Sequence, residues 1–142
     1  QPKPPADEPL PFGRFYSDHF LTIRWTASGG WEPPQIEPFR HLTLHPASLA
    51  FNHGQAVFEG MKAFMGVDGQ VRLFRPDLNM KRFARSAERL GFPAIEPDKL
   101  LECITQLVHT ERDWVPQSPG SSLYIRPVLL ECGHYIGTFA PT

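Results

Sequence analysis

The spacing of hydrophobic residues predicts where strands lie along this chain. From residue 20 to residue 25 two sets of side chains alternate, which is typical of a half-buried strand. Two short apolar segments, residues 61–64 and 71–74, flank a connector with Gly69 at its tip. This arrangement predicts a β-hairpin, because glycine accepts the positive φ angle that tight hairpin turns require.

Two later segments repeat hydrophobic residues at the helical period. The first begins near Pro76 and closes at Gly91, because proline suits the first turn of a helix and glycine commonly ends one. The second runs from about Pro97 to Trp114, and Glu111 is predicted to face outward from it. The predicted buried stripes are Met80, Phe83, Ala84, Ala87 and Leu90 in the first helix, and Leu100, Leu101, Ile104, Leu107 and Val108 in the second.

A further strand is predicted over residues 121–130, with Tyr124, Arg126 and Val128 on one face. An arginine between apolar neighbours is unusual, because a buried guanidinium needs acceptors or an anion. Two interpretations of Arg126 are about equally favoured. One is an internal ion pair, with Glu59 as a candidate partner, and the other is a charge at a site that receives carboxylates.

The chain bends just before the hairpin, where Gly54, Glu59 and Gly60 surround Val57 and Phe58. Such a group forms either a well-packed bend or one wall of a pocket. Spacing alone favours the structural interpretation.

Together the elements predict an α+β fold. A largely antiparallel sheet would hold the hairpin and the strand at residues 122–130, with both helices packed on one side. The chain has 142 residues, which suits a single domain, and residues 1–11 are predicted to form an extended Pro-rich arm.

Charge and cysteine content narrow the function classes. Basic residues number 14 and acidic residues 15, so no field favours nucleic acid or an acidic membrane surface. Cys103 and Cys132 support neither a disulfide framework nor a zinc site, and they indicate a reducing compartment, cytosol or mitochondrial matrix. No metal site is predicted, because His41 and His45 lie in an extended stretch bracketed by prolines.

Six motifs lie in order along nearly the whole chain. They are LTLHPAS (residues 42–48), VFEGMKAF (57–64), VRLFRPDLNMKR (71–82), RSAERL (85–90), DWVP (113–116) and SLYIRPVLL (122–130). With these motifs, residues 12–142 resemble the N-terminal small domain of a branched-chain amino-acid aminotransferase of fold type IV, a pyridoxal-phosphate class. D-amino-acid aminotransferase and aminodeoxychorismate lyase share this fold but are less similar to LFRPDLNMKR and SLYIRP.

The resemblance implies a transferase of branched-chain amino-acid metabolism that moves amino groups between Leu, Ile or Val and 2-oxoglutarate. The implied cofactor is pyridoxal 5'-phosphate. No catalytic residue is expected in this chain, because the Schiff-base lysine belongs to a larger C-terminal domain and the context of Lys3, Lys62, Lys81 and Lys99 does not match it. We therefore expect this chain alone to be inactive. The alternative is a non-catalytic, truncated relative that acts as a dimerisation or binding module.

The resemblance also implies a role for five residues of the site. Arg82 would reach the cofactor phosphate with a charge-assisted contact. Phe12, Phe58 and Tyr124 would form the wall around an aliphatic substrate side chain. Arg126 would serve the polar side, organising hydrogen bonds or receiving the second carboxylate of glutamate.

Three further residues complete the implied site. Ile136 and Thr138 resemble a loop lent to the active site of the neighbouring subunit, which implies a homodimer. His53 stands where the family usually has a tyrosine that helps to hold the substrate carboxylate. An imidazole can donate to a carboxylate and can also be protonated near neutral pH, so the role is either kept with altered pH dependence or lost.

Overall fold

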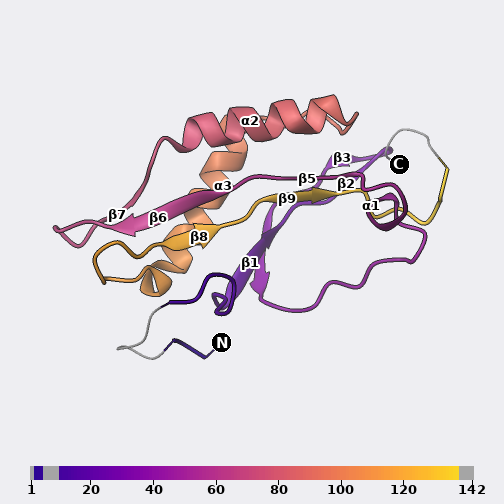
Figure 1. Ribbon diagram of the computed structural model, residues 1–142. Helices are drawn as coiled ribbons and strands as arrows, with labels where there is room; N and C mark the ends of the chain where they lie inside the picture. The colour runs from indigo at the N-terminus through magenta and orange to yellow at the C-terminus, as the bar shows by residue number, and fades with distance from the viewer. Residues whose placement is uncertain (1, 5–9, 138–142) are drawn as a thin grey trace.

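Both long helices predicted from the sequence are present in the computed structural model, which describes residues 2–4 and 10–137. They are α2 (Pro76–Arg89) and α3 (Pro97–Thr110), and Figure 1 shows that they run in clearly different directions. The remaining elements are β1 (His19–Thr22), β2 (Trp25–Thr26), β3 (Gly30–Trp31), β4 (Gln35–Pro38), α1 (Leu49–Asn52), β5 (Ala56–Phe58), β6 (Met61–Met65), β7 (Val71–Leu73), a short 3₁₀ helix (Arg112–Trp114), β8 (Leu123–Ile125) and β9 (Val128–Leu130).

The predicted hairpin is confirmed by the pairing of β6 with β7. These strands are antiparallel, and Ala63 lies opposite Leu73 in their register. Gly69, at the tip, has a φ angle of 73°. A residue with a side chain would be strained in this backbone conformation, whereas glycine adopts it readily. The hairpin therefore closes at the glycine that the sequence pattern indicated.

The prediction of a single strand over residues 121–130 is wrong, because this segment forms two separate strands, β8 and β9. Pro127 lies between them, and proline supplies no N–H for a continuous ladder of hydrogen bonds. β8 pairs with β6, whereas β9 pairs with β5. The carbonyl oxygen of Pro127 instead accepts a hydrogen bond from the backbone N–H of Glu59, at 3.0 Å.

Among the described residues all strand pairings are antiparallel, but the strands form four small sheets and not one. The sheets are β1–β4, β2–β3, β5–β9 and β7–β6–β8. The alternation predicted from residue 20 is not observed, since all four residues of β1 are half-buried. β4 pairs with one edge of β1 and α3 packs against the strand, so its residues are partly shielded from solvent.

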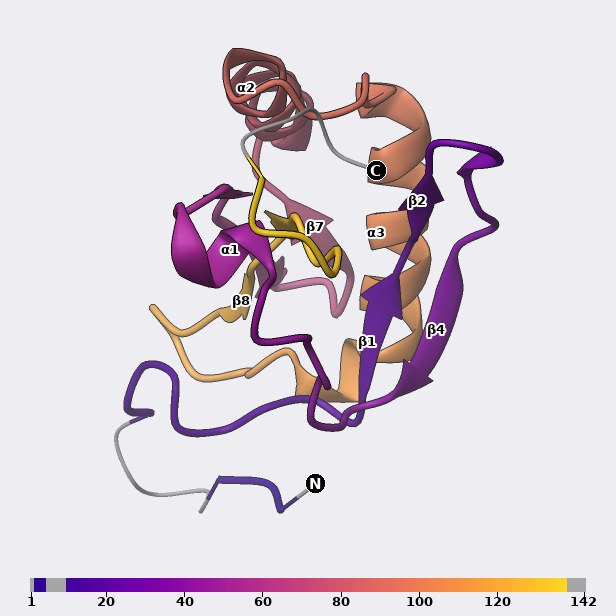
Figure 2. The same cartoon turned by 90° about the vertical axis from the view of Figure 1, so that its right-hand side faces the viewer.

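The main hydrophobic core lies between β6 and the two long helices. Met61 and Ala63 of β6 pack with residues of α2 and α3 that the helical pattern had placed inside. Those helical residues are Met80, Phe83, Ile104 and Val108. Leu90 is an exception to the predicted stripe, because it is 43% exposed at the end of α2, where Gly91 turns the chain away. Figure 2 shows α2 nearly end-on and α3 beside β1.

The prediction that Glu111 faces outward is wrong, because its side chain is buried. The residue is only 3% exposed. Its carboxylate accepts a hydrogen bond from the backbone N–H of Asp18 at 2.7 Å and lies 2.6 Å from Nδ1 of His19. The side chain therefore joins the end of α3 to the start of β1, a long-range contact that periodicity does not reveal.

The mixture of short antiparallel sheets and packed helices is an α+β architecture, as predicted. No helix within residues 2–4 and 10–137 combines the length and hydropathy needed to cross a bilayer. The same residues contain no group of three or more His, Cys, Asp or Glu side chains able to hold a metal ion. Cys103 and Cys132 are both free thiols.

Candidate functional site

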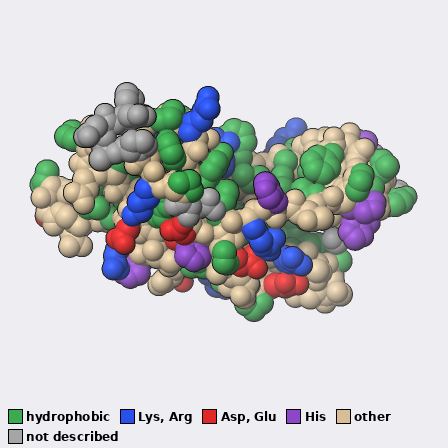
Figure 3. Space-filling model, turned by 90° about the horizontal axis from the view of Figure 1, so that it is seen from below, with side chains coloured by type: hydrophobic (Ala, Val, Ile, Leu, Met, Phe, Trp, Pro, Cys, Tyr) green, Lys and Arg blue, Asp and Glu red, His purple; other side chains and the backbone are tan. Residues whose placement is uncertain are grey.

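The face of β6 and β8 opposite the core carries an aromatic and cationic cluster. Met61 and Ala63 of β6 are buried in the core, so Lys62 between them, and Tyr124 opposite it on β8, point to the other side of the sheet. On that side the ring of Tyr124 meets the ring of Phe12 edge-on, with 4.9 Å between centroids. Phe12 and Phe58 are 74% and 63% exposed, and Figure 3 shows other hydrophobic side chains exposed between charged ones.

Arg126 connects these rings. Its Nε and Nη2 atoms donate to the hydroxyl oxygen of Tyr124, at 3.1 and 2.9 Å. Its guanidinium carbon lies 4.5 Å from the ring centroid of Phe58 and 5.1 Å from that of Tyr124, which are cation–π distances. The proposed ion pair with Glu59 is wrong, because Arg126 is exposed and Glu59 has another partner. The geometry agrees better with a charge available to a ligand.

Gly60 leaves space for the side chain of Tyr124 because it has no side chain of its own. A Cβ atom at position 60 would lie 2.2 Å from the hydroxyl oxygen of Tyr124 and 2.9 Å from its Cζ atom. Atoms essentially never approach so closely, so only glycine leaves room for this tyrosine. The φ angle of Gly60 is not positive, which shows that the requirement is for space and not for an unusual backbone.

Glu59 and Arg82 form the second part of the site, next to Gly60. The carboxylate of Glu59 is 4% exposed and accepts two hydrogen bonds from Arg82, from Nε at 2.7 Å and from Nη2 at 2.6 Å. It also accepts the N–H of Gly60 at 2.7 Å. Asn79, one turn before Arg82 on α2, donates to the carbonyl of Gly60 at 2.9 Å. Helix α2 is thus fastened to the bend before the hairpin.

This pairing leaves part of the Arg82 guanidinium free to bind a ligand. Glu59 occupies the edge formed by Nε and one N–H of Nη2, whereas a guanidinium has five N–H groups. The Arg82 side chain is 59% exposed, so the opposite edge faces solvent. A planar fork of N–H donors of this kind suits a phosphate or a carboxylate.

The ion pair between Glu59 and Arg82 also makes the stability of the fold depend on pH in the acid range. Hydrogen bonds from Arg82, followed by those from Gly60 and Asn79, lower the pKa of the Glu59 carboxyl from 4.5 to about 2. A carboxyl with a lowered pKa in the folded state stabilises the protein fully above its unfolded pKa. That stabilisation is lost as the pH falls from 4.5 through about 2.

We expect Glu59→Gln to flatten the acid dependence of stability. Between pH 4.5 and about 2 the free energy of unfolding of the unmodified protein should fall more than that of the variant. The expected difference is about 1–2 kcal/mol, since the exposure of Arg82 reduces the full value of such a shift. Urea denaturation at a series of pH values measures it. Two profiles that stay parallel below pH 4.5 would contradict the assignment.

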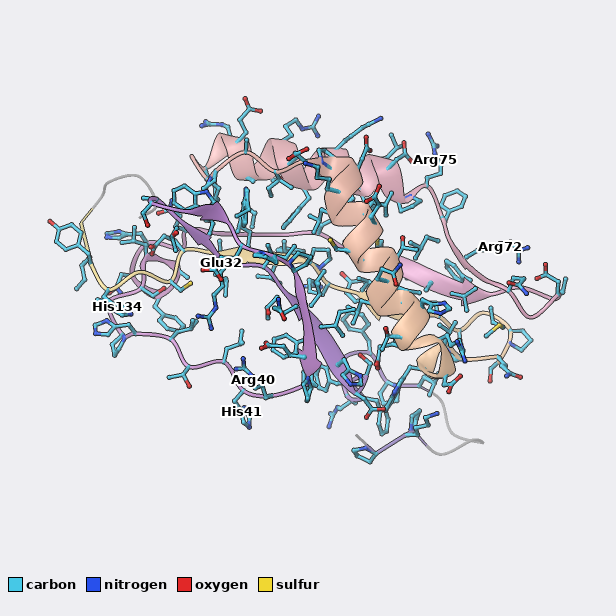
Figure 4. The ribbon with its side chains drawn as sticks, turned by 180° about the vertical axis from the view of Figure 1, so that it is seen from behind. Glu32, Arg40, His41, Arg72, Arg75 and His134 are labelled. Carbon is cyan, nitrogen blue, oxygen red and sulfur yellow. The ribbon has the colours of Figure 1, made fainter. Side chains whose placement is uncertain are left out.

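His53 and Ile136 contact each other, apart from the hydrogen bonds and ring contacts of the aromatic cluster. Nε2 of His53 is 3.1 Å from the carbonyl oxygen of Ile136. In the same loop His134 lies beside His45, with 4.7 Å between ring centroids, and Figure 4 shows His134 at the end of the molecule away from Arg72. Within the described part of the chain, His53 makes no hydrogen bond to Tyr124 or Arg126. Thr138, the other residue expected in this loop, lies outside the described residues.

The structure thus brings Phe12, Phe58, Tyr124 and Arg126 into one cluster, with Arg82 across Gly60 from it. Sequence reasoning missed two contributions to this site. Glu59 was considered only as a possible partner of Arg126, whereas its carboxylate binds Arg82. Gly60 was interpreted as part of a bend or of a pocket wall, with the bend favoured, and no local signal indicates that its lack of a side chain leaves space for Tyr124.

The sequence of this chain is strongly similar to those of known proteins. No protein-family model matches the chain. The chain is 51% identical over 140 residues to the mitochondrial branched-chain-amino-acid aminotransferase of Bos taurus, covering 99% of this chain and 36% of that protein. It is 45% identical over 140 residues to the cytosolic branched-chain-amino-acid aminotransferase of Rattus norvegicus, covering 99% and 34%. The chain therefore spans 34–36% of the length of these curated relatives.

Solved structures agree at the level of the fold. The branched-chain amino acid aminotransferase of Escherichia coli superposes with a TM-score of 0.65 at 24% identity, covering 89% of this chain and 37% of that one. A branched-chain amino acid aminotransferase of T.th. with pyridoxamine 5'-phosphate gives a TM-score of 0.62 at 25% identity, covering 87% and 35%. In both cases the match covers little more than a third of the solved chain.

Proposed function

Because this chain is related over almost its whole length to the branched-chain-amino-acid aminotransferases, we propose that it forms the small domain of such an enzyme. The assignment covers residues 12–142, preceded by an arm at residues 1–11. In the whole protein the reaction would be the transfer of an amino group between Leu, Ile or Val and 2-oxoglutarate. The fold would then be the small domain of fold type IV.

The cluster around Tyr124 is the observation that carries this proposal. Phe12 and Phe58 are exposed beside the half-buried Tyr124, and such aromatic surface favours an aliphatic side chain because each buried methylene contributes about 0.8 kcal/mol. Arg126 places a positive charge at the edge of the same surface. An apolar wall beside a cation suits a substrate that is apolar at one end and a carboxylate at the other.

The donors of Arg82 suit the proposed cofactor, pyridoxal 5'-phosphate. Its guanidinium is fixed on one edge by Glu59 and exposed on the other, which suits the dianionic phosphate of the cofactor. When bound, the cofactor would supply the electron sink and carry the amino group between substrates. This chain would contribute the anchor at Arg82 and the orientation of the substrate side chain against Tyr124.

His53, Ile136 and Thr138 are proposed to act on the substrate carboxylate and at the contact with the neighbouring subunit. We place His53 near the substrate carboxylate, as a donor in place of the usual tyrosine. Its contact with the carbonyl of Ile136 joins that loop to His53, so the loop is included in the proposed site. Ile136 and Thr138 would reach the neighbouring subunit of a homodimer. The compartment would be the cytosol or the mitochondrial matrix, since relatives of both kinds are found.

Transamination by the full-length protein, but not by this chain alone, is the test of the proposal. With pyridoxal phosphate, Leu and 2-oxoglutarate, the full-length protein should form glutamate, whereas residues 1–142 should form none. After borohydride reduction, peptide mapping of residues 1–142 should show no lysine modified stoichiometrically by the cofactor.

Two outcomes would contradict the proposal. A single trapped lysine within this chain, such as Lys62, would show that the covalent chemistry is placed wrongly. Cofactor-loaded full-length protein without activity on any branched-chain amino acid would favour a binding or dimerisation module.

A further inference from the structure

Lys62 lies on the same face of the sheet as the aromatic cluster. Its neighbours on β6, Met61 and Ala63, are 5% and 0% exposed and form part of the core, so Lys62 projects from the opposite face. In the β6–β8 register Lys62 is directly opposite Tyr124. Side chains of directly paired residues lie on the same face, with Cβ atoms about 4.5–5.5 Å apart. Lys62 is also exposed.

Among the described residues, no carboxylate forms an ion pair with the positive charges on this face. Glu59, the acidic residue closest to Lys62 in the sequence, is buried and binds Arg82. Within residues 2–4 and 10–137, neither Lys62 nor Arg126 takes part in an ion pair. Arg126 donates to the hydroxyl of Tyr124, whereas Lys62 makes no hydrogen bond through its side chain in that part of the chain. The face thus offers two cations to an anionic ligand.

We propose that Lys62 is a specificity-determining residue that receives the second carboxylate of a dicarboxylic substrate, together with Arg126. This inference rests on the proposed function, in which one site must accept both an aliphatic side chain and the side-chain carboxylate of glutamate or 2-oxoglutarate. The aromatic wall suits the first and is unfavourable for the second, because a carboxylate next to apolar surface needs charged partners. The ammonium group of Lys62 lies at the end of a flexible four-carbon chain. It would approach the second carboxylate of a dicarboxylic substrate, and it would turn back to solvent when the substrate side chain is aliphatic.

Binding of unreactive substrate analogues to the full-length, cofactor-loaded protein tests this role. Glutarate represents the dicarboxylic substrate and 4-methylpentanoate the branched-chain one. Lys62→Met keeps the length of the side chain and removes its charge. We expect it to weaken glutarate binding about tenfold or more, a change of about 1.4 kcal/mol, with binding of 4-methylpentanoate changed less than twofold. Titration calorimetry measures both, and kcat/KM for 2-oxoglutarate should fall in parallel.

Two further variants serve as controls. Lys62→Arg, which keeps the charge, should retain most of the affinity for glutarate. Lys99→Met removes a charge from α3, where Lys99 pairs with Glu96 at 2.8 Å, and should leave both affinities unchanged.

Unchanged glutarate affinity in Lys62→Met would overturn the assignment, and so would an equal loss of both ligands, which would indicate a structural role. Lys62-dependent glutarate binding by a protein inactive toward every branched-chain amino acid would support Lys62 and reject the proposed function.

Discussion

In the full-length protein, Arg82→Ala is expected to weaken cofactor binding by ten- to a hundredfold. A charged hydrogen bond to phosphate contributes roughly 1.5–3 kcal/mol, and each 1.4 kcal/mol is about a tenfold change in affinity. Substrate affinity should change less, because Arg82 donates its hydrogen bonds to Glu59, whereas Tyr124 contacts Phe12 and Arg126. The measurement is the dissociation constant of pyridoxal phosphate, obtained by fluorescence titration of the apoprotein.

Arg82→Ala also removes the partner of Glu59, so stability must be measured beside affinity. The carboxylate of Glu59 keeps the N–H groups of Gly60 and Asn79 as donors, but it loses both bonds from the guanidinium. Arg85→Ala is the matched control, since Arg85 lies on the same helix and is exposed. Cofactor affinity equal to that of the unmodified apoprotein, in a folded Arg82→Ala variant, would return Arg82 to a purely structural role.

Local signals predicted those parts of the fold that depend on neighbouring residues. The hairpin follows from Gly69, whose φ angle is positive, and α2 ends just before Gly91, which has a φ angle of 73°. The buried positions Met80 and Phe83 follow from helical periodicity. Each of these features is decided within a few residues, so the sequence pattern alone is sufficient to predict it.

The errors concern polar residues whose partners lie far away in the chain. Glu111 has the spacing of an exposed helical residue, but the start of β1 supplies an N–H and an imidazole that compensate for its burial. Glu59 was a candidate partner of Arg126, but the packing of α2 over the bend pairs it with Arg82. Side-chain roles at the site came from family resemblance, because no periodicity brings Phe12 and Tyr124 together.

Gly60→Ala should damage the substrate site while leaving the cofactor site nearly intact. The new Cβ atom would lie 2.2 Å from the hydroxyl oxygen of Tyr124, so the ring must move. Tyr124 would then lose its edge contact with Phe12 and the hydrogen bonds from Arg126. Contacts of these two kinds contribute about 0.5–1.5 and 1.5–3 kcal/mol.

We therefore expect the KM for a branched-chain substrate to rise roughly ten- to a hundredfold in the full-length Gly60→Ala variant. Its affinity for pyridoxal phosphate should stay within about threefold, because the side-chain bonds between Arg82 and Glu59 do not involve the Cα atom of Gly60. Gly29→Ala is the control, since its Cβ would meet only the Thr26 hydroxyl, at 3.1 Å in an exposed turn. In a Tyr124→Ala background the same change at Gly60 should have little further effect, because the clashing ring is gone. An undiminished effect there would show that Gly60 acts through the backbone and not by leaving space for Tyr124.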